Sequence, residues 1–324
     1  MPSLTTTPAA VREFADAVAL GLSDTPRWIP SRFLYDAAGS QLFERICEQP
    51  EYYPTRTEAS ILAREAAHLR DLTGPVALVE LGSGSSVKTD HLLAAYTAHG
   101  DTIRYVPVDV SASILHMAAE RIEETFPSVN VEGLHAEYED ALPLLASYAP
   151  VMLLFLGSTV GNLNHAESLA FWRRVSAALP TGGWVLLGVD LVKDPVILHA
   201  AYNDAAGVTA SFTRNLFARM NRELDAGLDL EAIRHEARWV PAWQRVEIGA
   251  RFLTRQELTV KPLDRRFAIG AGELVMTEIS RKFVLPHLRE YLMCFDLETV
   301  HVATDPDAWF ALLLLRKRAR APGG

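Results

Sequence analysis

A glycine-rich turn follows the first apolar segment of the chain that is typical of a buried strand. The turn reads Glu80-Leu-Gly-Ser-Gly-Ser-Ser86, and an acidic residue, Asp109, ends the next such segment. Glycines let a backbone approach a ligand closely, and an acidic residue at the second strand end binds a ribose diol in nucleotide-binding folds. The pattern predicts a nucleotide-like cofactor. The alternative is a tight strand-to-helix turn beside a surface aspartate.

The same turn lacks the features of a phosphate site. Val87 stands where G-x-G-x-x-G requires its third glycine, and no Gly-Lys-Ser/Thr sequence follows. The acidic Glu80 also disfavours a pyrophosphate. A ligand without phosphate, such as S-adenosylmethionine, therefore fits the turn better than a dinucleotide.

A second glycine turn follows a later apolar segment and reads Leu156-Gly-Ser-Thr-Val-Gly-Asn162. It could aim the Asn162 amide into a cleft, where one donor and one acceptor suit the two ends of an amino acid. The alternative is a turn asparagine that satisfies its own backbone.

Alternating strand-like and helical segments between Pro75 and Asp190 must position these turns. Short apolar strands separated by helices imply a parallel sheet with both faces covered, which is a doubly wound α/β domain. Ser111 is a plausible N-cap for one of the helices. Strands are predicted at 76–81, 104–110, 129–134, 151–156 and 184–191, and helices at 88–96 and 111–126.

The flanking segments do not extend this parallel series. Thr55-Arg-Thr-Glu58 has the form of a capping box that opens a helix. A later helical segment and three strand-like segments predict a second, smaller α+β unit. A short-linked pair of strands near the end predicts an antiparallel addition to the first sheet. These expectations cover a helix at 195–224, strands at 245–252, 257–263 and 274–279, a helix near 286–294, and the final pair at 297–302 and 310–315.

Composition excludes several classes of protein. The chain has 324 residues, with 40 acidic and 31 basic, and a formal net charge of -9, which disfavours a nucleic-acid partner. The basic segment Arg316-Lys-Arg-Ala-Arg320 is interpreted as a solvated end. Cys47 and Cys294 are too far apart for a disulfide framework or a zinc knuckle, which favours a reducing, cytoplasmic setting.

Charged residues near the start, such as Arg12, Glu13 and Asp16, argue against a signal peptide, and no apolar run is long enough for a membrane span. The histidines show no metal-ligand spacing, so no metal ion is expected. We expect a monomer that binds a small molecule and neither nucleic acid nor membrane.

Several segments, in order along nearly the whole chain, resemble the histidine-specific Nα-methyltransferase family. They are residues 35–44, 51–58, 80–86 with Lys88, 107–111, 156–162, 190–194, 201–210 and 277–283. The family makes trimethylhistidine (hercynine) for ergothioneine biosynthesis. The resemblance implies a class I methyltransferase, with a Rossmann-like doubly wound sheet and a smaller α+β substrate domain. It implies an S-adenosylmethionine-binding domain at 58–192 plus 283–324, and a substrate-binding domain at 1–57 plus 193–282.

The resemblance also implies functional residues, position by position. The expected cofactor residues are Tyr52, Gly82, Ser83, Gly84, Lys88, Asp109 and Glu137. The expected catalytic residues are Tyr35, Asn162 and Tyr202. The expected substrate residues are Tyr52, Phe43, Gly157, Asn162, Tyr202, Ile248, Glu278 and Ser280, the last two holding the imidazole. This chain departs from the family at Glu137, where the family has aspartate, and at Ile248, where it has methionine.

The reaction implied by the resemblance is transfer of three methyl groups from S-adenosylmethionine to the α-amino nitrogen of L-histidine. A sulfonium donor already carries an activated methyl group, so the protein needs neither a nucleophile nor a metal. Two alternatives stay open at this point. One is the same reaction on another amino acid such as tryptophan, and the other is a non-catalytic S-adenosylmethionine-binding protein of the same fold.

Overall fold

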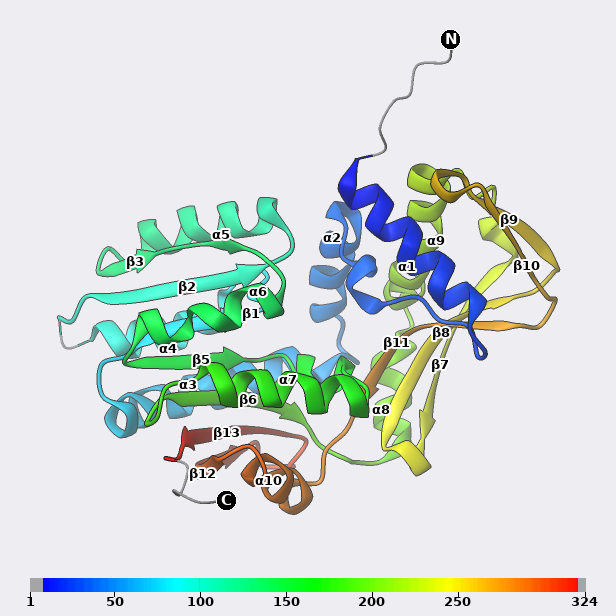
Figure 1. Ribbon diagram of the computed structural model, residues 1–324. Helices are drawn as coiled ribbons and strands as arrows, with labels where there is room; N and C mark the ends of the chain where they lie inside the picture. The colour runs from blue at the N-terminus through cyan, green and yellow to red at the C-terminus, as the bar shows by residue number, and fades with distance from the viewer. Residues whose placement is uncertain (1–7, 99, 320–324) are drawn as a thin grey trace, which may run out of the picture. The chain divides into compact units, whose positions relative to one another are not determined.

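The computed structural model describes residues 8–98 and 100–319, which divide into two compact units (Figure 1). The larger unit comprises Tyr53–Lys193 and the segment from Arg281 onward, and the smaller comprises the segment up to Tyr52 and Asp194–Ser280. The chain therefore passes between the units three times. These passages are Tyr52–Tyr53, Lys193–Asp194 and Ser280–Arg281.

The larger unit is built on one sheet with the strand order β12-β13-β6-β5-β1-β2-β3, with β4 also paired to β2. Strands β1 to β6 pair in parallel, and β13 is antiparallel to both β6 and β12. The predicted doubly wound sheet and its antiparallel addition are thus confirmed. The strands are β1 (Ala77–Leu81), β2 (Ile103–Asp109), β3 (Val129–Val131), β4 (Leu134–His135), β5 (Val151–Phe155), β6 (Trp184–Asp190), β12 (Leu297–Thr304) and β13 (Phe310–Lys317).

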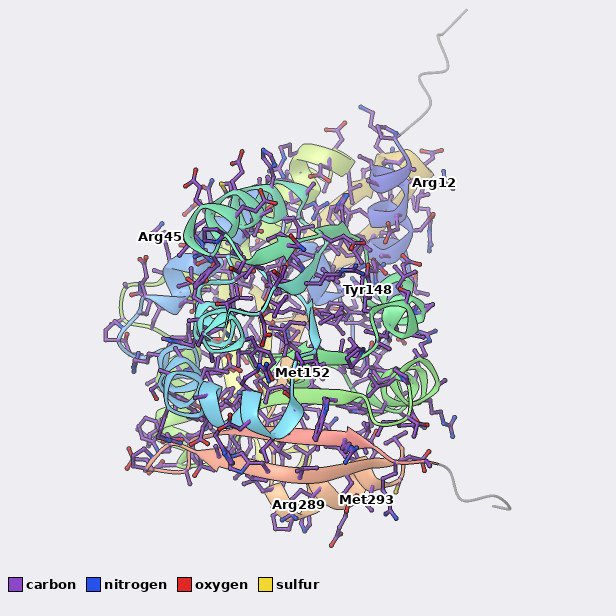
Figure 2. All side chains as sticks on the ribbon, turned by 90° about the vertical axis from the view of Figure 1, so that its left-hand side faces the viewer. Arg12, Arg45, Tyr148, Met152, Arg289 and Met293 are labelled. Atoms are coloured by element: carbon purple, nitrogen blue, oxygen red, sulfur yellow. The ribbon has the colours of Figure 1, made fainter. Side chains whose placement is uncertain are left out.

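Side chains alternate strictly between the two faces of this sheet. Leu78, Met152 and Leu186 pack under helices α3 and α4 on one face, whereas Leu153 and Leu187 pack under α7 and α10 on the other. Figure 2 shows Met152 within the sheet layer, where it is fully buried. Both faces are therefore covered by apolar helix surfaces. The helices of this unit are α3 (Tyr53–Thr73), α4 (Asp90–Thr97), α5 (Ala112–Thr125), α6 (Tyr138–Ala141), α7 (His165–Ala178) and α10 (Leu285–Met293), with 3-10 turns η2 (Val87–Thr89), η3 (Leu142–Tyr148) and η4 (Thr159–Asn162).

Two local predictions for the larger unit were wrong, and a third was confirmed in part. The strand predicted at 129–134 is two short strands, which are separated by Glu132 and Gly133, because glycine offers no side chain to pack. Ser111 is the N-cap residue of α5, as predicted, although its side chain makes no cap hydrogen bond and its backbone N–H donates to Asp109. Helix α3 begins at Tyr53, before Thr55, so the predicted capping box does not exist.

The smaller unit has its own sheet, β11-β8-β7, and an antiparallel pair, β9 and β10. The helix predicted at 195–224 is two helices, because Asp204 caps a new helix through the N–H groups of Val208 and Thr209. Strands β7 and β10 were not predicted. The elements are α1 (Ala9–Ser23), η1 (Ser31–Leu34), α2 (Ala37–Cys47), α8 (Pro195–Tyr202), α9 (Val208–Leu224), η5 (Leu230–Ala232), β7 (Ile233–Val240), η6 (Pro241–Trp243), β8 (Arg245–Phe252), β9 (Gln256–Val260), η7 (Lys261–Leu263), β10 (Arg265–Ile269) and β11 (Leu274–Arg281).

The core of the smaller unit joins α1, α9 and the sheet through residues such as Phe14, Phe217 and Phe252.

In the larger unit, Arg289 and Met293 of α10 point to solvent (Figure 2). Among the described residues, no helix combines the length and the apolar composition that a membrane span requires.

Candidate active site

The turn after β1 has a backbone conformation at Gly82 that favours glycine. Its φ is +64°, and a Cβ atom there would lie 2.7 Å from the Tyr138 hydroxyl. Asp109 holds the turn from the neighbouring strand: its Oδ2 accepts the Gly84 N–H at 3.0 Å, and its Oδ1 accepts the Ser111 N–H at 2.9 Å. The carboxylate therefore orders two backbone turns at the carboxyl edge of the sheet. Each of its oxygens keeps a second lone pair for a ligand.

Ser83, inside this turn, has a buried hydroxyl with no hydrogen-bond partner in the part of the chain that the structure describes. A buried hydroxyl without a partner costs free energy unless a ligand satisfies it. The exposed Glu137 directly precedes Tyr138, whose ring packs at 5.5 Å from Phe155. The turn thus fits a polar ligand that approaches the backbone closely, as the sequence predicts for S-adenosylmethionine.

Glu80, which lies in β1 just before its last residue, is a buried acid with two hydroxyl donors. Thr89 Oγ1 donates to its Oε2 at 2.7 Å, and the Tyr105 hydroxyl donates to the same oxygen. Burial raises the pKa of the Glu80 carboxyl to about 7, against the opposing effect of these two hydrogen bonds. The ionised form of Glu80 is therefore penalised in the folded protein.

Replacing Glu80 with glutamine should remove a pH-dependent part of the stability. Because the folded pKa lies above the unfolded value of 4.5, the contribution of Glu80 is complete at low pH and is lost as the pH rises through about 7. The free energy of unfolding of the wild type, relative to Glu80→Gln, should fall by up to about 3 kcal/mol between about pH 5 and about pH 8. Urea titrations of both proteins measure this difference. A difference that does not change with pH would contradict the assignment.

A second buried acid, Glu58, holds the glycine turn after β5. Both of its carboxylate oxygens accept the Gly157 N–H, at 2.8 and 2.9 Å, and it forms an ion pair with Lys88. Gly188 of β6 makes room for it, because a Cβ there would lie 2.0 Å from Glu58 Oε1. One carboxylate therefore joins Lys88, predicted for the cofactor, to Gly157, predicted for the substrate. Asn162 ends η4 in the same loop and is half-buried.

This role of Glu58 was missed at the level of sequence, where it was assigned to a capping box. Its side chain is fully buried, on the α3 face that carries Ile61 and Leu62. A signal was present, because Glu58 precedes those residues by three and four positions and so lies on their apolar face. An acid on the buried face of a helix needs a partner inside the protein.

The smaller unit brings five predicted residues into one aromatic cluster. Ring centroids lie 5.5 Å apart between Tyr35 and Phe43, 6.4 Å between Phe43 and Tyr52, and 6.2 Å between Tyr52 and Tyr202. The Tyr202 hydroxyl bonds the Ser280 hydroxyl at 2.8 Å. The cluster thus pairs apolar ring faces with hydroxyl groups, which suits a small polar ligand with an aromatic or aliphatic part.

Glu278 adds an acidic group to this cluster. Burial raises the pKa of the Tyr52 hydroxyl well above 10, and the nearby Tyr202 and Glu278 raise it further. Tyr52 is therefore a neutral phenol at neutral pH. Ile248 is buried on β8, and its carbonyl accepts a hydrogen bond from Thr277 of β11, next to Glu278.

His235, which was not predicted, supports Tyr202 from strand β7. One ring nitrogen of His235 bonds the Tyr202 carbonyl oxygen at 2.8 Å, and the other bonds the Thr213 hydroxyl at 2.8 Å. Burial lowers the pKa of His235, so the ring is neutral at pH 7 and donates through one nitrogen only. The sequence does not reveal this role, because β7 lacks the regular alternation that predicts a strand.

Comparisons with known proteins point to one family. The model of the family described as "Histidine-specific methyltransferase, SAM-dependent" matches residues 14–317. Histidine N-alpha-methyltransferase of Mycolicibacterium smegmatis is 41% identical to this chain, and that of Mycobacterium tuberculosis is 39% identical; each alignment covers 92% of both chains. Ergothioneine biosynthesis protein 1 of Neurospora crassa is 33% identical over 59% of this chain and 22% of its own length.

Proposed function

Because this chain belongs to the histidine-specific, S-adenosylmethionine-dependent methyltransferase family, we propose that it trimethylates the α-amino nitrogen of L-histidine. The product is hercynine, and the reaction is the first step of ergothioneine biosynthesis. The observation that carries this proposal is the similarity, over nearly the full length of both chains, to two histidine N-alpha-methyltransferases.

We assign cofactor binding to the larger unit. Its glycine turn offers the Ser83 hydroxyl, which lacks a partner among the described residues, and the free lone pairs of the Asp109 carboxylate. Gly82 and Gly84 let a ligand reach the backbone, and Lys88 and Glu137 complete the proposed set. These features support a ligand with a ribose diol and no phosphate.

We assign histidine binding to the aromatic cluster of the smaller unit, and the sequence resemblance also implies Gly157 and Asn162 as substrate residues. Tyr202 and Asn162 would hold the substrate carboxylate, since both offer neutral hydrogen-bond donors. Glu278 and Ser280 would accept and orient the imidazole N–H. Phe43 and Ile248 would then form the apolar walls of the ring slot.

S-adenosylmethionine supplies an activated methyl group when it is bound, so the side chains only align a neutral amine with it. An α-amino group has a pKa of about 7.7–8.0 at a chain terminus, and desolvation beside a cation lowers that value. No strong base is required. Tyr35 and Tyr52 would orient the amine through their hydroxyl groups, and the missing side chain at Gly157 would leave space for the added methyl groups.

One experiment decides between the proposal and its alternatives. The purified protein is incubated with methyl-labelled S-adenosylmethionine and each of the twenty amino acids, and the products are analysed by mass spectrometry. We expect label in histidine and a product carrying three methyl groups. Preferential labelling of tryptophan would contradict the proposed substrate, and bound cofactor without transfer to any amino acid would indicate a non-catalytic protein.

A further inference from the structure

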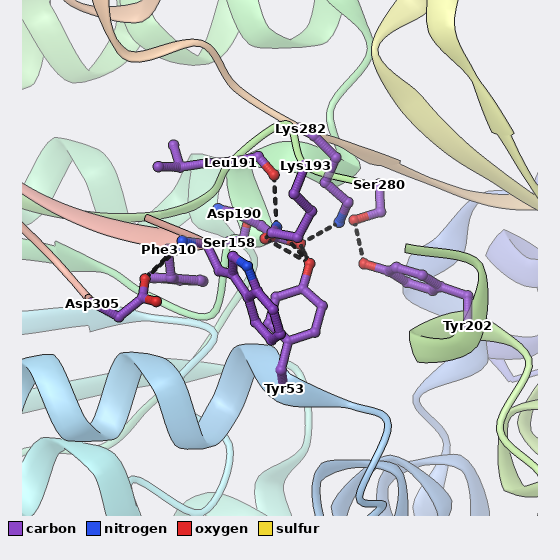
Figure 3. A network of polar contacts seen from close by, with 11 residues as sticks. Tyr53, Ser158, Asp190, Leu191, Lys193, Tyr202, Ser280, Lys282, Asp305 and Phe310 are labelled. Atoms are coloured by element: carbon purple, nitrogen blue, oxygen red, sulfur yellow. Dashed lines mark hydrogen bonds and ion pairs between the residues drawn. The ribbon is translucent and has the colours of Figure 1, made fainter. Parts of the chain in front are cut away.

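The last residue of β6, Asp190, is a fully buried carboxylate that has no part in the proposed chemistry. The Tyr53 hydroxyl donates to its oxygens at 2.9 and 2.8 Å, and Lys282 Nζ lies 2.7 Å from its Oδ2. Lys193 Nζ pairs with its Oδ1. Figure 3 shows these three side chains converging on the one carboxylate.

The three partners share one property along the chain. Tyr53 is the first residue of the larger unit after Tyr52, and Lys193 is the last residue before the chain leaves that unit again. Lys282 is the second residue after Ser280, where the chain returns. Each of the three passages between the units therefore has a side chain bound to Asp190 at its end or one residue beyond it.

The polar groups around Asp190 make further hydrogen bonds within the larger unit. Lys193 Nζ also donates to the Leu191 carbonyl and to the Tyr53 hydroxyl, each at 2.6 Å, and lies 4.5 Å from the centre of the Tyr53 ring. The Asp190 N–H donates to Ser158 Oγ at 2.9 Å, which connects the cluster to the glycine turn after β5. The side chains of Lys193 and Lys282 are 4% and 0% exposed, so bulk water does not screen these ion pairs.

Two of the passages lead directly into the aromatic cluster of the smaller unit. Tyr52 directly precedes Tyr53. The ring of Tyr52 packs against the ring of Tyr202, whose hydroxyl forms a hydrogen bond with the Ser280 hydroxyl. Ser280 in turn precedes Lys282 by two residues. A displacement of Tyr53 would therefore move Tyr52, which adjoins it, and a displacement of Lys282 would move Ser280, two residues away. We assign both Tyr52 and Ser280 to histidine binding.

We propose that Asp190 is a positioning residue for the amino-acid substrate, which acts by holding Tyr53 and Lys282 next to the passages Tyr52–Tyr53 and Ser280–Arg281. The inference rests on the proposed function, because Tyr52 and Ser280 are histidine-binding residues only within it. The simpler alternative is a structural ion cluster. Losing part of such a cluster would lower stability without discriminating between cofactor and amino acid.

The first test removes one hydroxyl group. Tyr53→Phe deletes the donor to Asp190 and keeps the ring, and Tyr96→Phe is the matched control, because its hydroxyl is also buried in the larger unit but bonds Thr73. We expect Tyr53→Phe to raise the KM for histidine at least about fivefold, with the Kd for S-adenosylmethionine within about twofold of wild type. Tyr96→Phe should change neither quantity by more than about twofold.

The second test removes one charge and does not depend on the first variant. Lys282→Met deletes a partner of Asp190, and Lys317→Met is its control, since Lys317 is buried on Ser176 and Asp296 far from any passage in the sequence. The same selective rise in histidine KM is expected for Lys282→Met only. Equal effects in variant and control, or a parallel loss of cofactor affinity, would overturn the inference.

The wild type separates this inference from the proposed function. If wild-type protein methylates histidine and neither variant raises its KM, the inference is wrong and the proposed function stands. If wild-type protein binds the cofactor but does not methylate histidine, the proposed function is wrong, and the inference is overturned with its premise.

Discussion

Replacing Glu58 with alanine should lower the free energy of unfolding by about 3–5 kcal/mol and abolish tight cofactor binding. Glu58 is fully buried, and its removal deletes an ion pair with Lys88, whose side chain is only 24% exposed. The Gly157 N–H loses its acceptor at the same time. Urea unfolding and calorimetry with S-adenosylmethionine measure the two effects.

Two further variants make this prediction specific. Asp16→Ala removes an exposed ion pair with Arg12 and should change stability by less than about 1 kcal/mol. Glu58→Gln keeps an oxygen for the Gly157 N–H but not the charge, so its loss of stability should lie between the other two. A loss below about 1 kcal/mol in Glu58→Ala would mean that water or a neighbouring group replaces the carboxylate.

The sheet of the larger unit could be predicted because its pattern is local. Buried parallel strands such as β5 are apolar on both faces, so they stand out as continuous apolar runs between helices. The pair β12 and β13 was recognised for a related reason, since a short link between two apolar strands requires an antiparallel return. Periodicity and connection length were sufficient here, without any knowledge of long-range contacts.

Strands of the smaller unit were harder to predict because their burial is incomplete. In β7, only Ile233 and Ala237 are buried, and polar or charged residues occupy the three positions between them. The strand β10 begins with Arg265 and Arg266 and has one buried residue, Ile269. Neither sequence has the regular alternation that identifies a half-buried strand. His235 was missed with β7.

Within the site, the glycine turn and Asp109 could be placed from strand ends alone, whereas the buried acids could not. Glu58 matched a local capping pattern, and its true partners, Lys88 and Gly157, are distant in the sequence. Two of the three partners of Asp190, Tyr53 and Lys282, are likewise distant from it in the sequence. A local motif cannot reveal a carboxylate that tertiary contacts have placed in the core.

Replacing Glu278 with alanine should lower kcat/KM for histidine at least about tenfold, or about 1.4 kcal/mol, if Glu278 accepts the imidazole N–H. Glu278 lies half-buried on β11 and is close enough to Tyr52 to raise the pKa of that hydroxyl. A buried polar group of the ligand that loses its hydrogen-bond partner costs more binding free energy than the loss of one apolar contact does. Steady-state kinetics with saturating cofactor measure the change.

Two variants separate this effect from general damage. Glu278→Gln retains an acceptor oxygen without the charge, so it should lose less activity than Glu278→Ala. Glu257→Ala removes a strand glutamate of the same unit that is exposed and paired only weakly, at 3.3 Å, with Arg255, and it should leave histidine turnover within about twofold of wild type. Equal losses in Glu257→Ala and Glu278→Ala would indicate a defect of the smaller unit and not of the ring slot.

The choice between histidine and tryptophan gives the sharper test of Glu278. A carboxylate facing the ring slot opposes a larger, mostly apolar indole, because burying a charge without a strong partner costs free energy. Ile248, where the family has methionine, is stiffer but adds no polarity, so it should reshape the slot without changing this order. Glu278→Ala should therefore narrow the difference in kcat/KM between the two amino acids. The value for histidine should fall, and the value for tryptophan should rise because the indole no longer faces a carboxylate. A wild type that prefers tryptophan, or a histidine rate unchanged in Glu278→Ala, would show that another residue selects the side chain.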